Sequence, residues 1–394
     1  MSASPSPAPS TSSSAAAAPS EERVREALTT VLDPEIRRPI TDLDMVRGVG
    51  IEPGHDGAAV TVGIALTTSG CPLRDTIIRD VTAAVEKVPG VARVVVDMTV
   101  MTDDERTALR TKLRGGVAEP VIPFSQPDNL TRVYAVASGK GGVGKSTVTA
   151  NLAAAMAADG LKVGVLDADV YGFSIPRMLG VEHPPTKVDD MILPPVAGDV
   201  KVISIGMFTQ PGRPVVWRGP MLHRALQQFL ADVFWGDLDV LLLDLPPGTG
   251  DIAISVAQLL PNAELLVVTT PQLAAAEVAE RAGSMAQATS QKVVGVIENM
   301  SWLVQDDGSR LEIFGSGGGQ RVADELGRTL ETEVPLLGQV PLEVSLREGG
   351  DSGEPSVRTA TDSPAADVLR DIARTLGHRS RGLAGRKLAI SPVG

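Results

Sequence analysis

The chain has 394 residues, which is enough for more than one domain with a sizeable core. Its formal net charge of −12 argues against non-specific binding to nucleic acid or anionic membranes, and an aromatic content of 3% argues against base-stacking surfaces. No stretch approaches about 18 uninterrupted apolar residues, so no membrane-spanning helix is expected. The one cysteine excludes an intramolecular disulfide and suits a reducing cytoplasm.

Residues 1–20 are rich in Ser, Ala and Pro, with neither a basic start nor an apolar core segment. They are expected to form a disordered tail rather than a secretion signal. The elements that follow predict a small α+β domain at 21–102. They are a helix over 21–31, a strand over 60–66, an amphipathic helix over 73–87 and a Val-rich strand over 91–101.

Cys71 precedes Pro72 near the predicted start of the helix 73–87. A thiol at a helix N-terminus is favoured as the thiolate, because the helix dipole stabilises negative charge there. A free cysteine is equally often a small buried hydrophobe. The sequence leaves both interpretations open.

Glycines and prolines between 115 and 127 indicate a linker, which we place at 103–130. From 131 to 378, apolar strand-like runs alternate with helical patterns, which predicts an α/β domain with a mostly parallel sheet covered by helices on both faces. The expected strands are 132–138, 162–167, 201–205, 239–244, 264–269 and 293–298. Residues 379–394 are expected to form a second tail.

The most informative run is Gly139-Lys140-Gly141-Gly142-Val143-Gly144-Lys145-Ser146-Thr147. It fits the phosphate-loop pattern and lies between a predicted strand and an Ala-rich predicted helix. Glycines allow successive N–H groups to face one anion, Lys145 reaches the terminal phosphates, and the Ser146 hydroxyl can bind Mg²⁺. Lys140 is either a solvated loop lysine or a second phosphate contact.

Two predicted strands end in carboxylates, Asp167 followed by Asp169 in one case and Asp244 in the other. Asp residues in such places are often only turn formers. Beside a phosphate loop, however, one carboxylate can hold metal-bound water and another can position the attacking water. Two such motifs after one phosphate loop favour a nucleotide hydrolase.

The loop 140–146 resembles the deviant phosphate loop of the SIMIBI class, and five further runs resemble the Mrp/ApbC family of iron–sulfur cluster carrier ATPases. The likeness covers roughly 120–378, and 21–102 resembles a small domain of iron–sulfur assembly factors through 67–73. The five runs are 167–176, 217–221, 244–251, 298–301 and 314–319.

The resemblance implies a homodimeric ATPase with ATP and Mg²⁺ as cofactors. It implies that Lys140 reaches a nucleotide phosphate across the dimer interface, that Asp169 positions or activates water, and that Asp167 and Asp244 support Mg²⁺ through water. Asn299 matches the family's adenine-contacting Asn, although an Asn there can also be a helix or turn cap.

The chain departs from the family pattern after Ser301. Many family members carry a Cys-x-x-Cys pair there, whereas 302–310 contains no cysteine. Four thiolates usually hold a cluster, and a homodimer of this chain supplies two, both Cys71, which is thereby a candidate cluster ligand as well as a thiol.

Three functions follow. The first is an ATP-hydrolysing carrier that binds a [4Fe-4S] cluster transiently and passes it from scaffold to apoprotein clients. The second is a nucleotide-gated scaffold that holds clients without a cluster of its own. The third, an ATPase that acts on membrane or DNA, is disfavoured by the acidic balance and by the lack of a C-terminal amphipathic helix.

Overall fold

The computed structural model describes residues 19–68, 71–113, 121–170, 172–209, 219–248, 251–272, 275–305 and 307–379. Apart from residues 19, 20 and 379, the two expected tails therefore lie outside the described residues. The chain divides into two compact units, Met1–Lys112 and Leu113–Gly394. Among the described residues, no helix combines the length and apolarity needed to cross a membrane.

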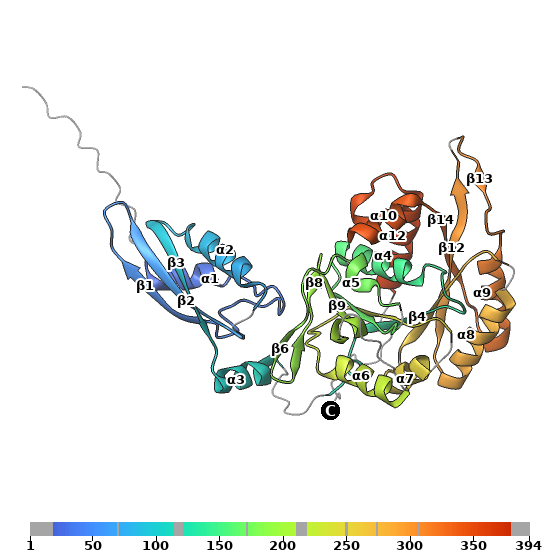
Figure 1. The fold of residues 1–394 in the computed structure, drawn as a ribbon, viewed down its shortest axis with the longest axis horizontal. Helices are drawn as coiled ribbons and strands as arrows, with labels where there is room; N and C mark the ends of the chain where they lie inside the picture. Colours follow the sequence, from blue (N-terminus) through green and yellow to red (C-terminus); the bar gives the residue numbers. More distant parts are fainter. Residues whose placement is uncertain are drawn as a thin grey trace, which may run out of the picture. The chain divides into compact units, whose positions relative to one another are not determined.

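The first unit is a three-stranded sheet in the order β1-β2-β3 with helices α1 and α2 packed together against it (Figure 1). β1 and β2 are antiparallel, and α2 forms the crossover between the parallel strands β2 and β3. The bounds are α1 Glu21–Leu28, β1 Val46–Glu52, β2 Ala58–Leu66, α2 Arg74–Val85 and β3 Val91–Val100. Both helices and the strands β2 and β3 lie where the sequence predicts them, whereas β1 was not predicted.

Helix α3, Asp103–Leu113, occupies the start of the segment 103–130 that the sequence analysis assigned to a linker. The linker prediction is wrong for these residues because Thr102 and Glu105 form a reciprocal capping box. The Thr102 amide donates to Glu105 Oε2 at 2.8 Å, and the Glu105 amide donates to Thr102 Oγ1 at 3.4 Å. Residues 114–120 lie outside the described part, and a short 3₁₀ helix, η1, follows at Pro123–Ser125.

The second unit contains a nine-stranded sheet in the order β13-β12-β11-β4-β10-β5-β9-β8, with β14 also paired to β12. The six consecutive strands β12, β11, β4, β10, β5 and β9 run parallel to one another, and β14 is parallel to β12. β8 and β13 are antiparallel additions, paired with β9 and β12. All six strands expected from the sequence are present. The bounds are β4 Arg132–Ala137, β5 Val163–Asp167, β8 Val196–Ala197, β9 Val200–Ser204, β10 Val240–Asp244, β11 Glu264–Thr269, β12 Val293–Val304, β13 Arg310–Leu311 and β14 Leu336–Leu342.

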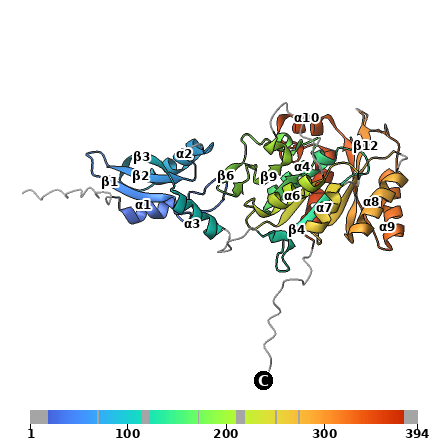
Figure 2. The same cartoon turned by 60° about the horizontal axis from the view of Figure 1, so that its bottom comes forward.

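Helices cover both faces of this sheet, as the apolar character of its strands requires (Figure 1 and Figure 2). On one face lie α4 Lys145–Ala158, α5 Ile175–Met178, α10 Val344–Ser352, α11 Ser356–Thr359 and α12 Pro364–Gly377. On the other face lie α6 Gly219–Ala231, α7 Asp251–Leu259, α8 Ala275–Thr289 and α9 Gly318–Leu330. The short helix η2, Ile205–Phe208, follows β9, and β6 Thr186–Val188 pairs with β7 Met191–Leu193 in a separate hairpin.

The register of the central strands brings the loops after them together. Asp244 at the end of β10 pairs with Val136 of β4 on one side and with Asp167 of β5 on the other. The phosphate loop follows β4, so both carboxylates end beside it. This is the edge at which parallel α/β sheets bind their ligands.

Candidate nucleotide site

The phosphate loop joins β4 to α4, and its backbone requires glycine at two positions. Gly142 and Gly144 have φ values of 77° and 76°, in the left-handed region. A Cβ on Gly144 would also lie 2.3 Å from Nδ2 of Asn299. Helix α4 begins at Lys145, immediately after this turn, so its free N–H groups face the loop.

Lys145 is buried and paired with the carboxylate of Asp244, at 2.7 Å from Nζ to Oδ1. The Ser146 hydroxyl donates to Asp244 Oδ2 at 2.6 Å, and the Thr149 hydroxyl donates to Asp244 Oδ1 at 2.9 Å. The structure therefore places the predicted phosphate lysine, the predicted Mg²⁺ hydroxyl and a predicted Mg²⁺ carboxylate in one cluster. Thr149 is a further member that the sequence analysis missed.

Asp167 is fully buried at the end of β5. Its carboxylate accepts hydrogen bonds from the amides of Asp169 and Ser174, at 3.1 and 3.2 Å, and from the Ser204 hydroxyl at 3.1 Å. Burial is the main cause that raises the pKa of Asp167 to about 7, and the nearby Asp244 carboxylate adds to the rise. The two carboxylates predicted to support Mg²⁺ thus differ in their electrostatic surroundings.

Asp169 lies in the loop after β5 and lines a cavity of about 220 Å³ together with residues of the phosphate loop, Ser174 and Pro247. Its carboxylate Oδ1 accepts a hydrogen bond from the Gly172 amide at 3.0 Å. The loop after β10 also contacts the phosphate loop, because the Gly248 amide donates to the Ser138 carbonyl at 2.9 Å. The cavity holds the expected nucleophile-positioning carboxylate next to the expected phosphate position.

Lys140 is half-buried and lines the same cavity. Its Nζ contacts the side-chain oxygen of Gln272, an exposed residue after β11. The backbone of Lys140 is held by the Ser138 hydroxyl, which donates to the Lys140 carbonyl at 3.0 Å. Among the interactions of the described residues, the lysine side chain is therefore bound at its tip, by one neutral residue.

Asn299 is buried at the point where β12 passes the phosphate loop, and its Nδ2 donates to the Val143 carbonyl at 2.9 Å. It also lines a second cavity of about 250 Å³ with Gly144, Thr147, Met178 and Met300. The side chain thus holds the loop and borders a space next to it. The hydrogen bond to Val143, which lies in the turn before α4, agrees with a turn cap, so the cap and the adenine contact both stay predictions.

Cys71 lies in the first unit, shortly before α2. Burial raises the pKa of the Cys71 thiol, and the Glu35 and Asp33 carboxylates raise it further, against a hydrogen bond from the Leu73 backbone. Of the two interpretations that the sequence leaves open, this direction favours the neutral thiol, with burial as the largest cause. In the described parts of the chain no three His, Cys, Asp or Glu side chains gather as a metal site.

The phosphate loop lies between a strand and a helix, and its lysine and serine both contact a carboxylate of the neighbouring strand in the sheet. This arrangement defines a P-loop nucleoside triphosphatase. A family model described as "NUBPL iron-transfer P-loop NTPase" matches residues 129–377, and one described as "Iron-sulfur cluster assembly protein" matches 21–96. The chain belongs to the NUBPL iron-transfer P-loop NTPase family. Both parts of the resemblance predicted from the motifs are thereby confirmed.

Two relatives named iron-sulfur cluster carrier protein extend this likeness over most of the chain. The protein from Mycobacterium leprae is 63% identical over 369 residues, which cover 94% of this chain and 96% of the relative. That from Bacillus subtilis is 40% identical over 90% of this chain and 97% of its own length. A nucleotide-binding protein from Archaeoglobus fulgidus in complex with ADP has 34% identity and a TM-score of 0.50, over 68% of this chain and 96% of its own.

Proposed function

We propose that this protein is an ATP-hydrolysing iron–sulfur cluster carrier that works as a homodimer in the cytoplasm. The observation that carries the proposal is the cluster of Lys145, Ser146 and Asp244 beside Lys140, in a chain whose relatives over nearly its whole length are named cluster carriers. Scaffold and apoprotein clients are its partners, and neither nucleic acid nor membrane is needed.

In the proposed site, the backbone of 139–147 and Lys145 bind the phosphates, and Asn299 borders the adenine. Asp169, at the edge of the phosphate cavity, orients the attacking water. The oxygen donors of Ser146, Asp244 and Asp167 suit Mg²⁺, which prefers hydroxyl, carboxylate and water ligands. Mg²⁺ would neutralise charge on the phosphates, and the carboxylates would hold it through water.

Lys140 is proposed to act on the nucleotide of the second chain. Its side chain is half-buried and its Nζ contacts only the amide oxygen of Gln272 among the interactions described, so closure of a dimer can redirect it. A cation supplied across an interface makes hydrolysis depend on that closure. Dimer opening and closing would then change the affinity for cluster or client.

The cluster is cargo in this proposal, and Cys71 is the thiol that each chain offers it. Two Cys71 thiols per homodimer are half of the usual ligand set, so the remaining ligands would come from outside the chain, such as client thiols. Because burial raises the pKa of Cys71, cluster binding must also drive deprotonation, and it should strengthen as pH rises.

The nucleotide site is tested by two lysine variants. Lys145→Ala should lose nucleotide binding at least a hundredfold, because it removes the phosphate cation and leaves the buried Asp244 unpaired. Lys140→Ala should keep nucleotide affinity within about threefold and lose turnover by a factor of roughly 10³. Titration with a fluorescent nucleotide and a phosphate-release assay measure the two effects.

The matched control is Gln272→Ala, which frees Lys140 without removing its charge and should retain turnover. Equal turnover in wild type and Lys140→Ala would exclude the proposed role of this lysine.

The cargo is tested by anaerobic reconstitution with iron and sulfide, followed by absorption spectroscopy and iron analysis. Wild type should bind a cluster that transfers to an apoprotein, and Cys71→Ser should not. A protein that holds no cluster, and whose Cys71→Ser variant still supports cluster delivery by a separate scaffold, would overturn the carrier role.

One observation favours a second function, a nucleotide-gated scaffold without a cluster of its own. Where family members commonly carry a cysteine pair, this chain has the β12–β13 hairpin, with Arg310 stacked at 4.0 Å over the Trp302 ring. An apolar and cationic surface there is better suited to contact with a client protein than to the binding of an iron–sulfur cluster, which requires thiolate ligands. ATP-dependent client binding by metal-free protein would support this function over the first.

A further inference from the structure

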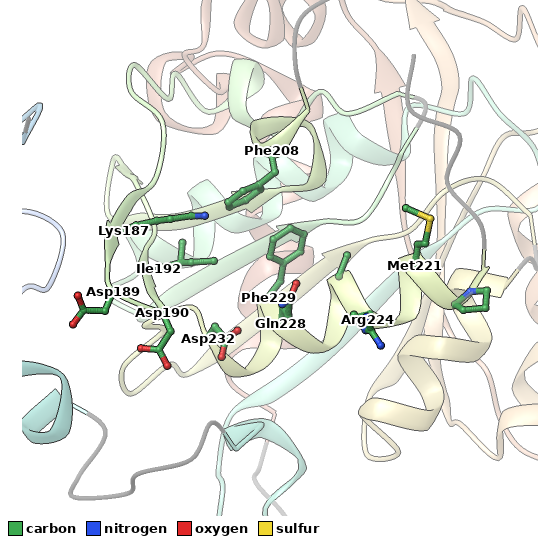
Figure 3. Close-up of a pocket in the computed structure, with 12 residues that line it drawn as sticks. Lys187, Asp189, Asp190, Ile192, Phe208, Met221, Arg224, Gln228, Phe229 and Asp232 are labelled. Carbon is green, nitrogen blue, oxygen red and sulfur yellow. The ribbon is translucent and has the colours of Figure 1, made fainter. Parts of the chain in front are cut away.

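A cavity of the second unit exposes apolar side chains between the β6–β7 hairpin, η2 and α6, and it has a volume of about 670 Å³ (Figure 3). Phe208 and Phe229 line it, with their ring centroids 5.0 Å apart. The carboxylates among its lining residues, Asp189, Asp190 and Asp232, already have interactions within the chain. Charge therefore does not indicate an occupant for this cavity, whereas it does at one edge of the first unit.

That edge is β3, which pairs with β2 alone among the described residues. The Met101 amide, directly after β3, donates to the Leu66 carbonyl of β2 at 2.8 Å. Because successive amides of a strand point to opposite sides, the amides and carbonyls of Val94, Val96 and Met98 point away from β2. β3 therefore presents a row of N–H and C=O groups on which another strand can pair.

The side chains of β3 also alternate between two surroundings. Val94 and Val96 are half-buried, on the face that α2 covers. Arg93, Val95 and Asp97 are exposed on the opposite face, and Val95 is 39% exposed. Within the described part of the chain, neither the Arg93 nor the Asp97 side chain has a hydrogen-bond or ion-pair partner. The exposed edge thus carries one cation and one anion, placed symmetrically about a valine.

Antiparallel pairing with the β3 of a second copy satisfies these charges. With a two-fold axis at Val95, Arg93 of each copy lies opposite Asp97 of the other, so two ion pairs flank a central contact between the Val95 side chains. These are non-hydrogen-bonded positions, where facing Cα atoms are about 4.5 Å apart and side chains are closest. On the other face Val94 lies opposite Val96, so half-buried apolar side chains gain cover as well.

The charge pattern selects this register over its neighbours. An axis at Val94 or Val96 would place both charges opposite uncharged residues, and an axis at Arg93 or Asp97 would place like charges opposite each other, which is destabilising. β3 also contains no proline, and the shift in its register with β2 lies at its start. The edge therefore lacks a proline and a central bulge, two of the devices that keep edge strands from pairing.

We propose that the β3 edges of two copies of this chain pair antiparallel about Val95, so that the first units of both copies share one continuous six-stranded sheet. The contact lies within the first unit, and it does not rest on the nucleotide site or on the cluster cargo. One strand pair buries less than the roughly 1,200–2,000 Å² of a stable interface, so the association is weak and reversible.

A disulfide trap in the full chain captures this contact. In a Cys71→Ser chain, an introduced cysteine is the one thiol present. Mild oxidation should convert Val95→Cys into a disulfide-linked dimer at least tenfold faster than the matched control Thr99→Cys, an exposed position on the same face of β3. Residue 95 faces its own copy at a distance that a disulfide spans, whereas the two residues 99 are about 26 Å apart. Equal rates for the two variants would overturn the proposal.

The ion pairs are tested by charge reversal in the Val95→Cys chain. Arg93→Asp and Asp97→Arg should each slow crosslinking at least fivefold, because like charges then face each other. The double variant restores opposite charges and should return to within twofold of the starting rate. Arg23→Asp, the same change at an exposed position of α1, is the control and should have no effect. A double variant as slow as the single ones, or an equal loss in the control, would contradict the register.

The alternative occupant of this edge is an extended segment of a different protein, which requires no symmetry about residue 95. In that case Val95→Cys would crosslink no faster than Thr99→Cys at any protein concentration, and the self-association would be excluded. Thermal melting of every variant shows that the first unit stays folded, so a slow rate reports on the contact itself.

Discussion

Two buried carboxylates, Asp167 and Asp244, sit side by side in the register of β5 and β10, yet their partners differ. Asp244 has a lysine at 2.7 Å, whereas Asp167 is held by backbone amides and by the Ser204 hydroxyl. Hydrogen bonds favour the ionised form of Asp167, but burial outweighs them. Asp167 has no ion pair among the interactions described, and with a pKa of about 7 its protonation changes near neutral pH.

This difference predicts how stability depends on pH. In the unfolded chain Asp167 loses its proton near pH 4, whereas in the folded chain its pKa is about 7. Between these values the folded state binds more protons, so the free energy of unfolding should fall as pH rises from about 4 to 7 and then level off. The contribution is on the order of a few kcal/mol across the window.

Asp167→Asn removes this titration. Urea unfolding of wild type and variant at pH 5 and pH 7.5 should show that wild type loses stability relative to Asp167→Asn at the higher pH. An unchanged difference between the two proteins at both pH values would contradict the assigned shift.

The residues of the phosphate loop, and the carboxylates that follow β5 and β10, could be predicted because their chemistry fixes residue type and spacing. Thr149 and Ser204 could not, because their role depends on which segments pack beside the carboxylates. The sequence could not decide between the thiol and the thiolate of Cys71 for the same reason. Asp33 and Glu35 lie far from it in the sequence and contribute only after the first unit has folded.

At the scale of elements, α3 illustrates how a local signal can be overlooked. Glycines and prolines dominate the segment after it, but its own start carries Thr102 and Glu105 in capping-box spacing and an acidic first turn. The Arg47 guanidinium and the Thr102 amide lower the pKa of Glu105 to about 2, so this cap remains intact in mild acid. Ion pairs from Arg47 to Glu105 and from Lys112 to Asp44 tie α3 to the first unit.

Removal of the cap should therefore destabilise this unit. Thr102→Ala should lower its free energy of unfolding by about 1 kcal/mol, because the first turn of α3 loses a side-chain acceptor. Chemical denaturation followed by circular dichroism measures the change. Thr107→Ala, at an exposed position inside the same helix, is the control and should have a smaller effect; a loss as large as that of Thr102→Ala would contradict the capping role.

The central strands could be predicted from the sequence, because a strand that is buried on both faces of a sheet consists of a continuous run of apolar residues. β1, with glycines at positions 48 and 50, and β14, with Gly338 and Pro341, lack such runs. They form because a neighbouring strand supplies the pairing, which is information that a single segment does not contain.

At the scale of the whole molecule, the proposed dimer makes a prediction that no single chain can satisfy. Lys140→Ala chains keep their nucleotide site, and Lys145→Ala chains keep Lys140. If Lys140 acts across the interface, mixing the two inactive variants should create mixed dimers with one working site. Equal amounts should recover about a quarter of wild-type turnover, since half of the dimers are mixed and each has one of two sites.

The measurement is steady-state phosphate release after the two variants have been incubated together. Turnover that stays at the level of the separate variants, under conditions where wild type is dimeric, would place Lys140 in its own chain's site.

The ion pair between Lys145 and Asp244 has a consequence for what the site accepts. A bare anion that approaches Lys145 must compete with a carboxylate already in place, in a buried setting where separating the charges is costly. A nucleotide that arrives with its divalent cation avoids this penalty, because the cation can take over the negative charge of Asp244 while the phosphates take over Lys145. We therefore expect the pair to discriminate against inorganic phosphate and metal-free nucleotide, and to favour the metal complex of the nucleotide.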